Sequence, residues 1–159
     1  IEMWIVDLAM PSAIKTNFSW INMEDLADYY EHGNLLEGEF IKSWERIVSF
    51  YNDTRFYKGF QFAELMINFI ESMKKEGYNH YLRAGQAHHY LTLHRGNGDL
   101  LFVPKCYSYE VNEQLKNVQS LKVSYRVNGI LLEDFEEDKI ALNSRIRILL
   151  NKLSEITIS

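Results

Sequence analysis

Histidine is concentrated in one stretch of this 159-residue chain, and imidazole is the side chain best suited to proton transfer near neutral pH. Four of the five histidines lie within residues 80–95. Apolar and polar residues alternate over 87–94, which predicts a strand with titratable and polar side chains on one face. The candidates are His88, Tyr90, Thr92 and His94, with Arg83 at the rim. Such a face could act on an anionic substrate, so a small enzyme or ligand-binding domain is one hypothesis.

A structural interpretation of the same histidines is favoured, because His and Tyr are ordinary residents of the half-exposed face of a sheet. The spacing fixes no carboxylate partner of the triad type, and the pairs His88–His89 and His88–His94 match no zinc pattern. The single cysteine, Cys106, could be a nucleophile, but an isolated cysteine is more often small, inert and partly buried. The sequence therefore predicts neither a metal nor a cofactor.

A second candidate is the acidic run from Glu133 to Asp138, which only Phe135 interrupts. It could be a docking surface for a basic partner, or the solvated first turn of a last helix over 140–153. Its spacing lacks the Asp-x-Asp-x-Asp-Gly phase of a calcium loop, which makes a cation site the weaker alternative. The carboxylates that we expect to bind a partner are Glu133, Asp134, Glu136 and Glu137.

Aromatic side chains form a third candidate, since Phe56 and Tyr57 lie beside Arg55 and Lys58 outside any helical period. They could form a hot spot in a protein interface. The alternative is a loop that folds over the core with its aromatic rings inside.

Charge selects among the possible partners. The formal net charge is −5 and the pI is near 5.5, so the field of the protein repels nucleic acid and anionic lipid and attracts basic partners. The favoured function is a non-enzymatic binding protein of the inhibitor, adaptor or immunity type, recognising a basic protein through acidic and aromatic surface. The aromatic content of 14% also makes a homodimer plausible.

The cysteine count and the first residues predict the compartment. A lone cysteine makes no internal disulfide, which is typical of cytoplasmic proteins. The early apolar run, Met3 to Met10, is interrupted by Asp7 and lacks a basic leader, so we expect neither a signal peptide nor a membrane span.

The elements that must position these residues follow from hydrophobic period and turn chemistry. The expected helices span residues 22–32, 34–51, 62–75, 109–118 and 140–153, with Gly33 and Gly77 as stops. The strand over 87–94 should form one hairpin with 100–103 through Asn97–Gly98, and Pro104 should end it. A second hairpin should join 121–127 to 130–132 through Asn128–Gly129.

Because neighbouring strands pair and no βαβ alternation occurs, the predicted class is α+β. We expect one domain over 1–159, with a helical part at about 20–78 and a hairpin-rich part at about 80–159. Its architecture should be an antiparallel sheet of two hairpins packed against about four to five helices.

Overall fold

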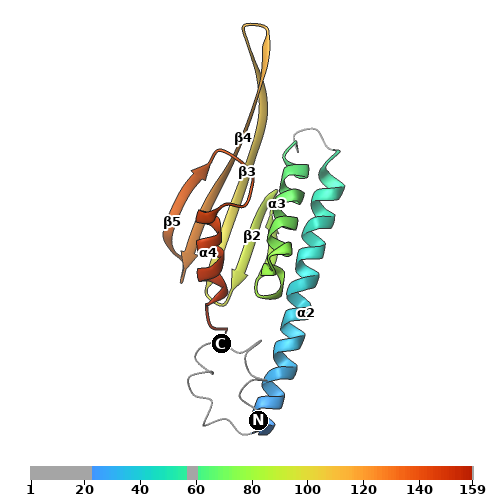
Figure 1. Cartoon of the computed structure of the whole chain (residues 1–159), viewed down its shortest axis with the longest axis vertical. Coiled ribbons are helices and arrows are strands. Elements are labelled where there is room, and N and C mark those ends of the chain that lie inside the picture. Colours follow the sequence, from blue (N-terminus) through green and yellow to red (C-terminus); the bar gives the residue numbers. More distant parts are fainter. Residues whose placement is uncertain (1–22, 57–60, 159) are drawn as a thin grey trace.

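The computed structural model describes residues 23–56 and 61–158, with side chains from residue 34 onward. Its centre is one antiparallel sheet of five strands in the order β1-β2-β3-β4-β5 (Figure 1). The strands are β1 Arg83–Ala87, β2 Tyr90–Arg95, β3 Gly98–Val111, β4 Gln114–Val127 and β5 Ile130–Glu137. The helices are α2 Met23–Thr54, α3 Ala63–Lys75 and α4 Ser144–Ser154, with a 3₁₀ turn η3 at Tyr78–His80.

The predicted architecture is wrong, although the antiparallel pairing of neighbouring strands is correct. The sheet is a continuous five-stranded meander rather than two hairpins, and the described part of the chain contains three α-helices rather than four or five. Two differences account for most of the discrepancy. The helices expected over 22–32 and 34–51 are the single helix α2, and the helix expected over 109–118 is the end of β3 and the start of β4.

Helix α2 runs through Gly33, where a stop was predicted. A glycine inside a helix costs only about 1 kcal/mol relative to alanine. The buried stripe of Phe40, Trp44, Ile47 and Tyr51 outweighs that cost. The predicted helix over 62–75 is confirmed as α3, and Gly77 has the expected positive φ of 89° after it.

The predicted strand over 87–94 is wrong in its first half. Residues His88 and His89 form the turn between β1 and β2, where His88 has a φ of 57°. The predicted hairpin between β2 and β3 is confirmed, but its turn is centred on Gly96 and Asn97, one residue earlier than expected. Pro104 does not end β3. The pairing of β3 with β2 ends at Phe102, so on that side no strand needs the backbone N–H that proline lacks.

The predicted helix over 109–118 is wrong, since these residues form the end of the β3–β4 hairpin. Asn112 and Glu113 make its turn with φ values of 51° and 64°. The spacing of Val111, Leu115 and Val118 fits a helix by chance. Hydrophobic periodicity uses only neighbouring residues and carries no information about which strand a segment pairs with. This end of the hairpin, which we call the arm (residues 105–120), projects beyond the rest of the molecule (Figure 1).

The predicted turn at Asn128–Gly129 is confirmed, with φ values of 55° and 74° between β4 and β5. The acidic residues from Glu133 to Glu137 belong to β5 and not to the start of a helix, and Asp138 follows the strand. Helix α4 begins only at Ser144, where the side chain of Asn143 accepts a hydrogen bond from the Ile146 amide at 2.9 Å.

Helices α3 and α4 cover one face of the sheet. Phe69 of α3 packs edge-to-face on Phe102 of β3, and Leu153 of α4 lies over Gly98 of the same strand. Even-numbered residues of β3 point to one side, so both helices lie on that face. Helix α2 instead follows the β1 edge, and one apolar core joins all these elements.

Candidate functional site

Strand β5 (Ile130–Glu137) is an edge of the sheet, and its alternation splits the acidic run between two faces. Asp134 and Glu136 lie opposite Ser124 and Lys122 of β4 on the uncovered face. Glu133, Phe135 and Glu137 point toward the helices. The run is therefore not one continuous patch but two acidic rows on either side of the same strand.

Three aliphatic residues precede the carboxylates and are exposed, a feature that the sequence analysis missed. Ile130, Leu131 and Leu132 are 63%, 47% and 56% exposed. The ladder shifts register between Tyr125 and Arg126, which leaves Leu132 without a partner in β4. Three consecutive apolar residues after an Asn–Gly turn were the available signal, because on an edge strand at most one face of them can be buried.

Few described contacts neutralise the negative charge of the β5 carboxylates. Asp134 accepts a hydrogen bond from the Ser124 hydroxyl at 2.9 Å, and the Lys122 ammonium lies 3.8 Å from its other oxygen. On the covered face, burial raises the pKa of the Tyr125 hydroxyl, and the neighbouring Glu133 raises it further. The Arg145 guanidinium of α4 lies 3.7 Å above the Phe135 ring, which places one cation over the covered face.

The predicted aromatic surface lies far from β5. Phe56 follows the end of α2 and is 80% exposed, with the Arg55 guanidinium 4.7 Å from its ring. Tyr57 is outside the described residues. Because α2 flanks the β1 edge and β5 is the opposite edge, the acidic and aromatic candidates do not share one surface (Figure 1).

The histidine candidates are divided by the fold. His94 and Thr92 share the uncovered face of β2, with the His94 Nε2 3.0 Å from the Thr92 hydroxyl. His88 is in the turn at the other end of β2, beside the Tyr90 ring. Tyr90 and His94 are four residue steps apart along β2, about 13 Å at strand spacing. Arg83 lies opposite His94, but its guanidinium contacts Glu39 of α2 at 2.9 Å.

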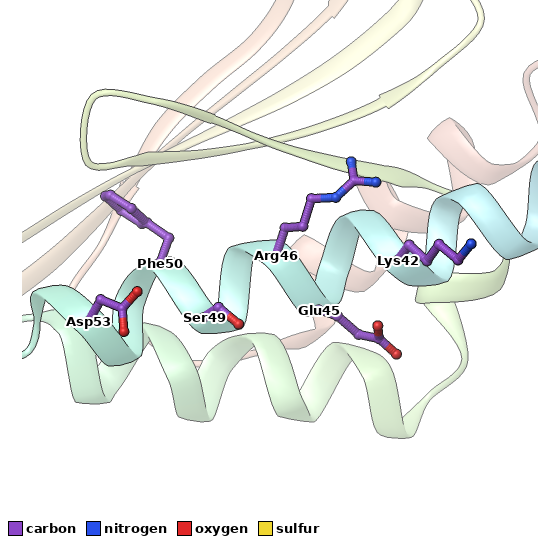
Figure 2. A pocket seen from close by; sticks show the side chains of 6 residues that line it. All are labelled: Lys42, Glu45, Arg46, Ser49, Phe50 and Asp53. Atoms are coloured by element: carbon purple, nitrogen blue, oxygen red, sulfur yellow. The ribbon is translucent and has the colours of Figure 1, made fainter.

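Two other surface features, a hollow on α2 and the exposed side chains of the arm, do not bring reactive side chains together. A shallow hollow on α2 is lined by Lys42, Glu45, Arg46, Ser49, Phe50 and Asp53, and Figure 2 shows these side chains spreading from the helix rather than converging. The arm exposes Tyr107, Tyr109, Val111 and Leu115. Cys106 lies at the base of the arm and is partly buried.

Within the described ranges, no three His, Cys, Asp or Glu side chains are grouped so that they could hold a metal ion. None of the described helices is both long and apolar enough to cross a membrane. Comparisons with protein-family models, curated proteins and solved structures gave no match.

Proposed function

We propose that this chain is a non-enzymatic binding protein, and that the surface of β5 recognises a basic protein partner. The observation that carries this proposal is the combination of four carboxylates with three exposed aliphatic side chains on one edge strand. The four carboxylates are Glu133, Asp134, Glu136 and Glu137, and the aliphatic residues are Ile130, Leu131 and Leu132.

This combination supports binding because the two kinds of side chain contribute differently. Exposed apolar residues at the centre of an interface lose water when a partner binds, and that provides affinity. Surrounding charges attract an oppositely charged partner from a distance and reject wrong ones. With an overall net charge of −5, the field of the whole protein acts in the same direction.

The enzyme hypothesis ranks below binding. Its residues would need to converge on one point, and His88 and His94 lie at opposite ends of β2. Arg83 is already paired with Glu39, which reduces the positive charge offered to an anionic substrate.

The experiment is a pull-down of the tagged protein from its native lysate at low and moderate salt, with mass spectrometry of the retained proteins. The test variant carries Glu133→Lys, Glu136→Lys and Glu137→Lys. The matched control reverses three exposed acids elsewhere, Glu45→Lys, Asp53→Lys and Glu64→Lys, so both variants have the same net charge.

We expect a basic protein that the wild type and the control retain at low salt and that the β5 variant loses. Equal loss from both variants would show that only the overall field matters. No stoichiometric partner at either salt concentration would refute the proposed function, and screening of anionic ligands against His94 and Thr92 would follow.

A further inference from the structure

The two edges of the sheet are treated differently by the fold. At the β1 edge, α2 supplies partners for backbone groups: the Ser43 hydroxyl accepts from the Ala84 amide at 2.9 Å, and the Trp44 indole donates to the Leu82 carbonyl at 2.7 Å. At the β5 edge, the described part of the chain supplies no hydrogen bond to the outward backbone groups. Within residues 23–56 and 61–158, α2 therefore packs along the β1 edge and binds one of its amides, whereas no element pairs with the β5 edge.

An open edge is a template for another strand, and proteins usually blunt it with proline, lysine or a bulge. Strand β5 contains no proline and no lysine, and its bulge at Leu132 leaves the five residues from Glu133 to Glu137 in regular pairing with β4. The side chains of this regular segment are all acidic except Phe135. Their negative charge repels an acidic strand and attracts a basic one.

We propose that β5 accepts an extended basic segment of the partner protein as a sixth strand. The backbone groups at the outward edge of β5 would bind those of the added strand, which is the mode of peptide recognition by strand addition. Asp134 and Glu136 lie two residues apart on the uncovered face, so the segment should carry Lys or Arg at alternate positions. This inference rests on the proposed function and specifies how the partner is held.

A second copy of this chain fits the same edge poorly. If two copies of β5 paired antiparallel over their whole length, Glu133 would lie opposite Asp134, and Leu131 opposite Glu136. Like charges directly opposite each other in a ladder are destabilising. Charge complementarity thus selects a basic strand over a homodimer.

The test uses two synthetic peptides of ten residues that alternate lysine and valine and have blocked termini. One is unmodified, and in the other the four central residues, two lysines and two valines, are N-methylated, which keeps the charge but removes backbone donors from both edges of the peptide. Binding to the full chain is measured by calorimetry at low ionic strength, and amide exchange in β5 is followed by NMR.

We expect the N-methylated peptide to bind at least about tenfold more weakly, because several backbone hydrogen bonds are lost. Only the unmodified peptide should slow the exchange of amides in 133–137. Asp134→Asn with Glu136→Gln should weaken its binding, whereas Glu45→Gln with Asp53→Asn should not.

Equal affinity of the two peptides, or no binding of either, overturns strand addition. Either result leaves the proposed function standing if the lysate pull-down still retains a basic protein through β5. The two proposals can therefore fail separately.

Discussion

The indole Nε1 of Trp44 donates a hydrogen bond to the backbone carbonyl of Leu82, 2.7 Å away, and so ties the middle of α2 to the residue before β1. Two further contacts from α2 reach the same hairpin. Ser43 accepts from the Ala84 amide, and the Tyr51 hydroxyl donates to the His89 carbonyl at 2.8 Å. Helix α2 therefore holds the β1–β2 hairpin through three side-chain hydrogen bonds, one of which satisfies a backbone amide of β1 itself.

Replacing Ser43 with alanine tests this role. The Ala84 amide would lose its acceptor in a buried position, which should lower the free energy of unfolding by about 1–3 kcal/mol. Ser49→Ala is the matched control, because Ser49 is exposed on the same helix and gains the same helix propensity. Urea unfolding measures both variants. Equal stability of the two would contradict a structural role for the Ser43 hydroxyl.

Two glycines should respond to alanine in opposite directions. A Cβ at Gly98 would lie 2.3 Å from the Ile156 Cδ1 and 2.8 Å from the Leu153 Cδ1, so overpacking should cost about 1–3 kcal/mol. A Cβ at Gly38 in α2 meets no atom within 4 Å, and alanine there should stabilise by about 0.5–1 kcal/mol. Thermal unfolding of both variants checks the signs, and a stabilised Gly98→Ala would show that α4 does not pack on β3 as described.

The turns of the β3–β4 and β4–β5 hairpins, each with two residues of positive φ, can be compared by amide hydrogen exchange. Glu113 and Gly129 occupy the second turn position with φ values of 64° and 74°. Glu113→Gly should relieve left-handed strain and slow amide exchange in the arm, whereas Gly129→Ala should destabilise the β4–β5 turn by about 1 kcal/mol. NMR hydrogen exchange distinguishes the two turns. Faster exchange in the arm of Glu113→Gly would contradict the assigned turn.

Sequence reasoning succeeded where the local signal and the packing agree. The stripe of Met66, Phe69, Ile70 and Met73 has helical period, and all four side chains are buried in α3. Asn128–Gly129 forms the predicted turn because both residues accept positive φ at little cost.

Sequence reasoning failed where contacts between residues far apart in the chain determine the structure. The turn at His88–His89 contains neither glycine nor asparagine, so nothing local marked it, and the contact of His89 with Tyr51 of α2 is 38 residues away in sequence. At β5 the Asn–Gly turn and the apolar residues 130–132 predicted the start of a strand. The acidic run after them suggested a helix start, so the continuation of the strand to Glu137 was not predicted.

The pH dependence of stability tests the packing at that unpredicted turn. The His89 ring lies 4.5 Å from Tyr90 and 5.2 Å from Phe62, and burial, with a smaller effect of His88, lowers its pKa. A lowered pKa in the folded state means that the contribution is fully present above the unfolded value of about 6.5 and is lost as the pH falls through the folded pKa. The free energy of unfolding should therefore decrease between about pH 7 and pH 5.

His89→Phe should reduce that decrease, because the aromatic packing remains and the titrating group is gone. His88→Gln should raise the pKa of His89 toward its ordinary value and reduce the decrease in part, since one of the two causes is removed. Urea unfolding across the pH range, with NMR titration of His89, measures both effects. A His89 that titrates at or above about 6.5 in the wild type would show that its ring is solvated, and the turn would then not pack against Phe62.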